Sequence, residues 1–520
     1  MTATVAQPRL DVLIRNGWVA DGTGNPLYPA DIAISGDRIL EVGHLLANVT
    51  AARVIDATGK IVCPGFVDAH SHSDRSIHAN PTAQSTIRQG ITTEIVGNCG
   101  SSHAPITGTS FGEYLDGLDA MGISPNLASY VGHNTMRRAA GVQGAAVTTD
   151  QIHAMRGMVR DAMEAGALGL STGLEFEPGR VATMEEIVEL AVVAGQYRGY
   201  YTSHIRNRDA ALQAAVDECL EVGRRAGTPV QVSHLNVRHN TGAADGAWQR
   251  AADTVEHARR DGMDAMADMT PFREGIGSLT AILPAWFVAE GQTRGAQLLA
   301  DKTIRARLRN ECDRYWRFIH RGEWDRVRVM SSGAFPEISG KPMDEIARLW
   351  EQDPWDCYFD LLAAAWGNSS SLGGMAVLFT DEHLAEVISH PLFSLAVDGW
   401  TSQIDGPLSE SSRHPLYFSG MVHYLTHHVR ELHTLRLEEA IRKMTSLPAT
   451  RFELHDRGLL RAGCFADVVV FDYDALDDGS TIEQPLAYCR GVEHVLVNGT
   501  AVVSEGEHTE ARPGRTLRRR

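Results

Sequence analysis

The amino-acid sequence predicts an α/β protein built on a (β/α)8 TIM barrel. Eight short apolar segments, each the length of one buried strand, are spread over residues 61–399. Segments with helical spacing of apolar residues lie between several of them, as at 150–164, 184–197, 209–225 and 247–261. The 520 residues also leave enough chain for an accessory domain beside a barrel.

The strand candidates are short, mostly apolar runs that each end in polar residues. They are residues 61–68, 91–98, 127–134, 167–172, 200–206, 229–235, 263–269 and 393–399. Strands that alternate with helices form a parallel sheet covered by helices on both faces, and about eight such units favour closure into a barrel. An open doubly-wound sheet is the alternative fold, but no G-x-G-x-x-G follows the first strand to support it.

The two ends of the chain show a different pattern from the middle. Residues 10–62 and 463–505 alternate apolar and polar side chains between turn signals, which is typical of short antiparallel strands. We therefore expect a small composite β-sandwich domain from residues 1–62 and 452–510, with the barrel spanning 63–451. Residues 284–391, before the last barrel strand, are too long for a loop and predict an insertion that could cover the barrel mouth as a lid.

Composition excludes several classes of protein. A net charge of −17 argues against general nucleic-acid binding, and no apolar run is long enough to span a membrane. The first ten residues lack the pattern of a signal peptide, and seven scattered cysteines, an odd number, do not predict a disulfide framework. We expect a cytoplasmic protein with a small-molecule substrate, and a homo-oligomer remains open.

Side chains that bind metals follow the strand candidates at their carboxyl ends, where TIM barrels carry their active sites. They are His70, His72, Cys99, His204, His234 and Asp398. Imidazole and thiolate suit zinc, and a carboxylate can act as a ligand or as a base. Each residue alone has a plainer explanation, such as a core histidine, a small buried cysteine or a turn aspartate. Their shared position at strand ends is what predicts a metal site.

Several longer motifs carry a family resemblance. They are Pro64-Gly-Phe-Val-Asp-Ala-His-Ser-His72, Gly90-Ile-Thr-Thr93, Val96-Gly-Asn-Cys-Gly100, Gly169-Leu-Ser-Thr-Gly-Leu174, Tyr201-Thr-Ser-His-Ile-Arg206, Val232-Ser-His-Leu235, Met444-Thr-Ser-Leu-Pro-Ala449 and Gly463-x-x-Ala-Asp467. With these motifs the chain resembles the amidohydrolase superfamily, in particular its N-acyl-D-amino-acid deacylase (D-aminoacylase) branch. The resemblance covers nearly the whole chain.

The resemblance implies one or two zinc ions and a role for each ligand. Cys99 would bridge the metals in the place of a carboxylated lysine, and none of the four lysines of this chain ends a strand candidate. His204, His234 and Cys99 would hold the tighter zinc, and His70 and His72 a weaker one. Asp398 would be the general base for attack of zinc-activated water on an amide carbonyl, which cleaves a C–N bond.

The chain departs from this branch where the substrate would bind. Asn236 stands where relatives usually have a lysine, Phe272 where they have a second tyrosine, and His414 begins a His-Pro-Leu in place of His-Pro-Arg. Without these groups the usual binding site for the substrate carboxylate is missing. This favours a neutral or apolar amide as substrate, bound by Phe272 and tryptophans of the insertion. Arg206 could position a substrate oxygen or form a structural salt bridge.

Three other functions remain open. The chain could be an N-acyl-D-amino-acid deacylase proper, or a zinc-dependent esterase, lactonase or C–C hydrolase, because zinc hydroxide attacks any electrophilic carbonyl. A metal-free binding protein is the third, and the complete set of ligands argues against it.

Overall fold

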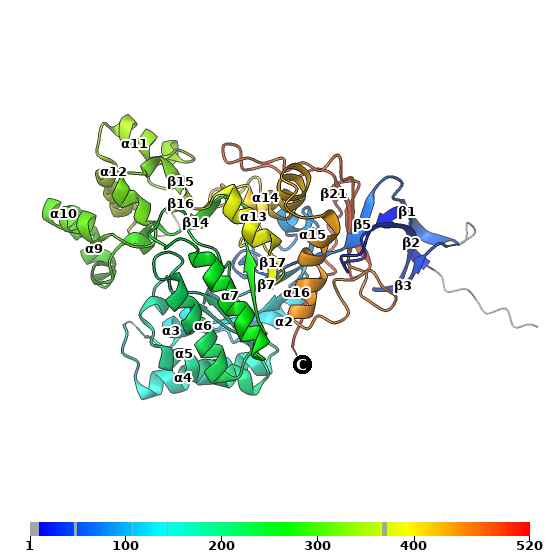
Figure 1. The fold of residues 1–520 in the computed structure, drawn as a ribbon, viewed down its shortest axis with the longest axis horizontal. Helices are drawn as coiled ribbons and strands as arrows, with labels where there is room; N and C mark the ends of the chain where they lie inside the picture. The colour runs from blue at the N-terminus through cyan, green and yellow to red at the C-terminus, as the bar shows by residue number, and fades with distance from the viewer. Residues whose placement is uncertain (1–9, 46–48, 107, 143, 367–371, 520) are drawn as a thin grey trace, which may run out of the picture.

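The computed structural model describes residues 10–45, 49–106, 108–142, 144–366 and 372–519. These residues form an α/β fold with two parallel sheets at its centre (Figure 1). One sheet has the order β6-β7-β8 and the other the order β17-β13-β12-β11-β10-β9. The strands are β6 (Phe66–Asp68), β7 (Ile91–Val96), β8 (Asn126–Ser129), β9 (Val131–Gly132), β10 (Gly169–Gly173), β11 (Tyr200–His204), β12 (Val230–Val232), β13 (Ala265–Met269) and β17 (Phe393–Leu395).

Each of the eight predicted strand segments overlaps at least one of these strands. Every residue in them is buried, as expected for parallel strands covered on both faces. Only Tyr130 separates β8 from β9 in the chain. After the ends of β6 and β17, Ser71 pairs in parallel with Gly399, and the His72 N–H donates to the Gly399 carbonyl at 2.7 Å.

Four helices follow the predicted segments closely and pack side by side in chain order (Figure 1). They are α4 (Thr149–Glu164), α5 (Met184–Gln196), α6 (Leu212–Ala226) and α7 (Ala247–Arg260). Thr148 and Gln151 form a capping box at the start of α4, and Gly227 ends α6 in the left-handed conformation. The remaining helices around the parallel strands are α1 (Gln84–Ile87), α2 (Phe111–Met121), α3 (His133–Ala139), α14 (Leu416–His423), α15 (Leu437–Met444) and α16 (Ser446–Arg451).

Strands from both ends of the chain form one nine-stranded sheet. Its order is β21-β20-β19-β18-β5-β1-β2-β3, with β4 also paired to β1. The strands are β1 (Leu10–Val19), β2 (Tyr28–Ser35), β3 (Arg38–Gly43), β4 (Ala51–Asp56), β5 (Ile61–Pro64), β18 (Val468–Phe471), β19 (Val492–Val497), β20 (Thr500–Ser504) and β21 (Glu507–His508). The antiparallel pairing of β5 with β18 joins the two ends. Residues 1–9 of the expected β domain lie outside the described residues.

The segment between β13 and β17 has its own secondary structure. Its three-stranded antiparallel sheet has the order β14-β16-β15, and the helices between residues 291 and 365 project to one side of the molecule (Figure 1). The strands are β14 (Glu274–Gly277), β15 (Val327–Ser332) and β16 (Leu372–Val377), and the helices are α8 (Ala285–Val288), α9 (Gly291–Leu299), α10 (Lys302–Glu311), α11 (Met343–Trp350), α12 (Pro354–Ala365) and α13 (Asp381–Ser389). Residues 367–371 lie outside the described residues.

No helix among the described residues is both long enough and apolar enough to cross a membrane.

Candidate metal centre

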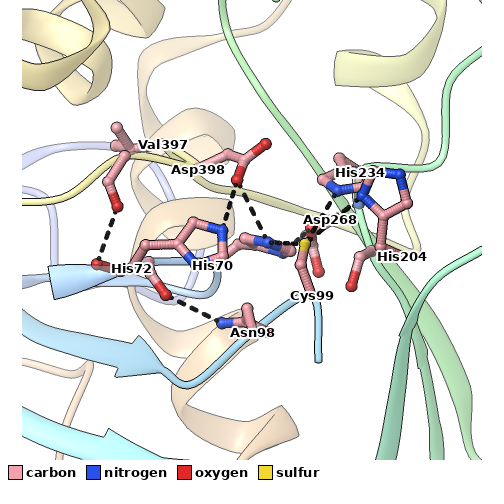
Figure 2. Close-up of polar contacts among 12 residues, drawn as sticks. His70, His72, Asn98, Cys99, His204, His234, Asp268, Val397 and Asp398 are labelled. Atoms are coloured by element: carbon pink, nitrogen blue, oxygen red, sulfur yellow. Dashed lines mark hydrogen bonds and ion pairs between the residues drawn. The ribbon is translucent and has the colours of Figure 1, made fainter. Parts of the chain in front are cut away.

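Four potential metal ligands converge at the carboxyl ends of the parallel strands. One ligand atom from each of His70, Cys99, His234 and Asp398 lies within 4.8 Å of the others. The sulfur of Cys99 is central, because it lies 3.3 Å from His70 Nε2, 3.5 Å from His234 Nε2 and 3.6 Å from His204 Nδ1 (Figure 2). Side chains that are far apart in the sequence thus surround one thiol.

The backbone at three of these residues is left-handed, a conformation that side chains other than glycine rarely adopt. The φ angles are 50° at Cys99, 34° at His234 and 62° at Asp398. Such angles cost free energy and cluster at functional sites, where the surrounding structure holds them. Gly100, also left-handed, lies so close to the end of β10 that a Cβ there would be 2.6 Å from the Gly173 nitrogen. The turn after β7 therefore requires glycine beside the cysteine.

Charge favours a thiolate at the centre. Burial alone would raise the pKa of Cys99, but the charge of His70 and hydrogen bonds from His204 and His234 hold it well below its ordinary value. Burial likewise lowers the pKa of His70, but the negative charges of Cys99 and Asp268 raise it well above its ordinary value. Thiolate and imidazole in contact are a donor set that zinc prefers.

Asp268, the last polar side chain of β13, orients two of the histidines. Its Oδ1 lies 3.1 Å from His70 Nδ1 and accepts a hydrogen bond from the His234 backbone N–H at 2.8 Å. Its Oδ2 accepts a hydrogen bond from Gln231 Nε2 at 2.7 Å. A carboxylate on the far nitrogen of a histidine fixes the ring and its tautomer, so His70 Nε2 is directed at the cluster.

Glu175 orients the ring of His204 in the same way. Glu175 was not among the residues predicted from the sequence. Its Oε2 lies 2.8 Å from His204 Nε2, and both its oxygens accept hydrogen bonds from Arg238. Glu175 and Arg238 are almost completely buried. Glu175 follows β10 by two residues, so its position at a strand end was the signal available in the sequence.

His72 and Asp398 meet on the other side of the cluster. Asp398 Oδ1 lies 3.1 Å from His72 Nε2 and 3.4 Å from His70 Nε2. Burial raises the pKa of Asp398. The charge of His70 and the hydrogen bond with His72 lower it by more, so the pKa is below its ordinary value. The Nδ1 atom of His72 is buried and has no hydrogen-bond partner among the described residues.

The cluster opens into a cavity of about 440 Å³. Its walls include four arginines, together with Tyr315 from the segment between β13 and β17 and Trp400 after β17. The arginines are Arg75, Arg138, Arg180 and Arg208. Arg208 is buried beside the cluster, Arg180 is half-buried, and Arg75 and Arg138 are exposed. Three acids, Glu175, Glu177 and Asp398, also line the cavity, so the arginines bring positive charge to a lining that carries negative charge as well.

The residues predicted to bind substrate are not gathered in this cavity. Arg206 donates hydrogen bonds to both oxygens of Glu218 and to the backbone carbonyls of Arg180 and Ala182. It does not line the cavity, and its contacts are those of a structural salt bridge. Asn236 is fully buried and also lies behind the cavity wall, where its Oδ1 accepts a hydrogen bond from Arg208 at 3.1 Å.

Phe272 and His414 lie elsewhere. Phe272 stacks on His423 at 4.0 Å and borders a separate cavity of about 500 Å³. His414 packs edge-on against Phe272, and its Nε2 lies 3.2 Å from the Glu274 carbonyl oxygen. Among the described residues that line the cavity of the cluster there is also no tryptophan from the segment 284–391. The expected lining by Phe272 and by tryptophans of the insertion is wrong, because these aromatic side chains pack against one another or into the core.

Arg208, which the sequence analysis missed, is the cation nearest to the cluster. Its Nη1 lies 3.0 Å from His234 Nδ1, and burial followed by the charge of Arg208 lowers the pKa of His234 to about 4. The residue lies in the loop after β11, four positions beyond His204. No local pattern distinguishes it from Arg206.

Comparison with known proteins gives the family. The amidohydrolase family model matches residues 53–503. The N-acyl-D-glutamate deacylase of Alcaligenes xylosoxydans xylosoxydans is 35% identical over 99% of this chain and 97% of its own length. The D-aminoacylase of the same organism is 31% identical over 100% of this chain and 99% of its own.

A solved structure agrees over almost the whole chain. The crystal structure of N-acyl-D-glutamate deacylase from Bordetella bronchiseptica, in complex with zinc and a phosphonate inhibitor, superposes with a TM-score of 0.82 at 31% identity and covers 98% of this chain and 100% of its own. The family match, the relatives and the converging ligands lead to one conclusion: this chain belongs to the amidohydrolase family and is a metal-dependent amide hydrolase related to the D-aminoacylases.

Proposed function

We propose that this protein is a zinc-dependent N-acyl-D-amino-acid deacylase, which hydrolyses the amide bond of an N-acyl-D-amino acid to a carboxylate and a free D-amino acid. The observation that carries the proposal is the cysteine–histidine cluster at the floor of a cavity whose lining includes four arginines. A carboxylate-bearing substrate fits such a cavity, and the related proteins are named as deacylases of acylated D-amino acids.

The donor atoms fit zinc. Cys99 is stabilised as a thiolate, the imidazole nitrogens face its sulfur, and the buried Nδ1 of His72 lacks a partner. Cys99, His204 and His234 would hold one ion, and His70 and His72 a second. Bound zinc would supply an acidified water and polarise the substrate carbonyl.

Asp398 is the proposed general base. Its side chain is 29% exposed, and it lines the cavity next to the cluster. A pKa below its ordinary value keeps the carboxylate ionised at neutral pH, so Oδ1 or Oδ2 can accept a proton from the attacking water. Asp398 then returns the proton to the departing nitrogen, which an amine leaving group requires.

The comparisons favour an N-acyl-D-amino acid as the substrate over the neutral amide expected from the sequence. That expectation rested on a missing cation at Asn236 and a missing hydroxyl at Phe272. In the structure Arg208 supplies a cation beside Asn236, and Phe272 borders another cavity. The esterase, lactonase and C–C hydrolase alternatives have no comparable support among the relatives.

We also infer that the two parallel sheets belong to one eight-stranded barrel, because β8 runs into β9 and Ser71 meets Gly399. The domain division proposed with it is 1–62 plus 452–510 for the β domain and 63–451 for the barrel, with 284–391 as an insertion. Val288 and Tyr315 of that insertion line the cavity, which supports a covering role.

The test is amine release from N-acetyl-D-glutamate, N-acetyl-D-leucine and their L enantiomers, with zinc content measured on the same sample. The proposal expects turnover of D substrates that disappears on chelation and returns with zinc. Turnover of only neutral anilides, or of esters alone, would contradict it.

A further inference from the structure

The geometry points to Arg208 as the residue that binds the α-carboxylate of the substrate, with Asn236 holding its guanidinium in place. This inference rests on the proposed function and adds a specificity-determining residue to it. It follows from how Arg208 uses its three nitrogens.

Only one nitrogen of the guanidinium is engaged. Nη1 donates to Asn236 Oδ1 at 3.1 Å and to the His234 carbonyl at 3.4 Å, and it lies 3.0 Å from His234 Nδ1. Nε is buried without a hydrogen bond, and no hydrogen bond joins Nη2 to any described residue. A buried N–H without an acceptor is unfavourable, so this edge is suited to an acceptor from the substrate.

The free edge has the shape of a carboxylate receptor. The Nε–H and Nη2–H bonds of arginine point the same way and match the two oxygens of one carboxylate. The acid nearest to that edge is Glu175, whose Oε2 is 3.9 Å from Nε, too far for a hydrogen bond. Glu175 is already paired with Arg238 and His204, so it does not saturate Arg208.

Metal binding would leave Arg208 still more available. If His234 uses Nε2 as a ligand, its neutral ring carries the proton on Nδ1. That nitrogen could then no longer accept a hydrogen bond from Arg208 Nη1. Asn236 and the His234 carbonyl would remain as its anchors, and the guanidinium would lie within the same cavity as Asp398.

Asn236 is thus a support and not a lost cation. Its Oδ1 faces Arg208, and its Nδ2 is buried without a partner in the described part of the chain. An asparagine at this position holds Arg208 without offsetting its charge, whereas the carboxylate of an aspartate would offset it.

The experiment compares three substrates that differ in one group. N-acetyl-D-glutamate has both carboxylates, N-acetyl-D-glutamine keeps only the α-carboxylate, and N-acetyl-D-isoglutamine keeps only the side-chain carboxylate. The variants are R208M, R208K and N236D, with R225M as the control, because Arg225 is an arginine of α6 that pairs with Glu185 at the surface.

We expect R208M to raise KM about tenfold or more for the two substrates with an α-carboxylate, with little change in kcat and none for the isoglutamine derivative. R208K and N236D should have intermediate effects, and R225M none. Calorimetric binding of N-acetyl-D-glutamate to D398N and to D398N/R208M, with and without zinc, should show the same loss of affinity.

An equal effect of R208M on all three substrates, or none on binding, would overturn the inference and leave Arg208 as a support for His234. A selective effect on the isoglutamine derivative would show that Arg208 binds the side-chain carboxylate, and this result would also overturn the inference. Failure of the wild type to cleave any of the three would instead reject the proposed function. Zinc content and thermal unfolding of each variant exclude loss of metal or fold.

Discussion

Glu175 Oε2 lies 2.8 Å from His204 Nε2 while both oxygens of Glu175 bind Arg238, so a fully buried ion pair sets the orientation of one ring of the metal centre. Burial raises the pKa of Glu175, but Arg238 and His204 hold it far below its ordinary value. The carboxylate is therefore charged at every pH at which the protein would work.

Removing this carboxylate should weaken the metal site. The E175Q variant replaces the carboxylate with a neutral amide that has only one acceptor oxygen. This amide cannot accept hydrogen bonds from both Arg238 and His204, so we expect zinc affinity to fall about 10–100-fold. Competition with a chromogenic chelator measures it. E177Q, at a neighbouring position that is only half-buried, is the matched control. Unchanged zinc affinity in E175Q would show that Glu175 does not orient His204.

The same pair supports the fold. E175L leaves the Arg238 guanidinium buried without its main partner, which should lower the free energy of unfolding by about 3–5 kcal/mol. Urea denaturation of the zinc-free protein separates this loss from the loss of metal. A change below about 1 kcal/mol would contradict a buried charge at Arg238.

Asp398 should affect chemistry more than metal binding. D398N removes the proton acceptor but keeps the size of the side chain, so we expect kcat to fall about 10²–10⁴-fold while zinc stays bound. Turnover and zinc content on one sample decide this. C99A is the complementary variant, and it should lose both zinc and activity. A D398N enzyme near wild-type activity would exclude Asp398 as the base.

The outer arginines should steer anionic substrates. Arg75 and Arg138 are exposed at the cavity, and burial followed by the charge of Arg314 lowers the pKa of Arg180 to about 10, so it too stays cationic at neutral pH. R75M/R138M should lower kcat/KM for N-acetyl-D-glutamate more than for N-acetyl-D-leucine, and the loss should shrink at high salt. Equal losses at all salt concentrations would indicate direct contacts or a structural defect.

Lys443 should give the fold a pH dependence. Its Nζ is buried and donates to the His390 carbonyl, and burial lowers its pKa to about 7. Between that value and the ordinary lysine range, near 10.5, the unfolded chain binds a proton that the folded chain does not. Stability from this group therefore rises with pH, by up to about 1.4 kcal/mol per unit in that window.

The variant K443M removes this contribution. The unfolding free energy of the wild type minus that of K443M should increase from pH 7 to pH 10, as measured by urea denaturation. A difference that stays constant with pH would mean that Lys443 keeps its proton in the folded state.

Local patterns in the sequence were sufficient for the parallel strands, for four of the helices between them and for most of the cluster. Mostly apolar segments predicted the parallel strands, because strands covered on both faces need no polar alternation. The carboxyl ends of such strands meet at one edge, so His70, Cys99 and His234 could be brought together without knowledge of a single distance.

The surroundings of the cluster could not be read in this way. Arg206 and Arg208 are two residues apart, yet one binds Glu218 outside the cavity and the other lies beside His234. Phe272 follows β13 as expected for a pocket residue but turns toward His423. Loop paths decide these contacts, and loops carry no periodic signal.

The sequence by itself thus determined the α/β class with its parallel strands, and it predicted the candidate metal ligands that converge and Asp398 as a candidate base. Only the tertiary structure decided which charges face the cavity, that Asn236 holds a cation, and that Glu175 and Arg238 support His204. The physical reason is range: strand periodicity is a local property of the chain, whereas a buried ion pair depends on segments that meet only after folding.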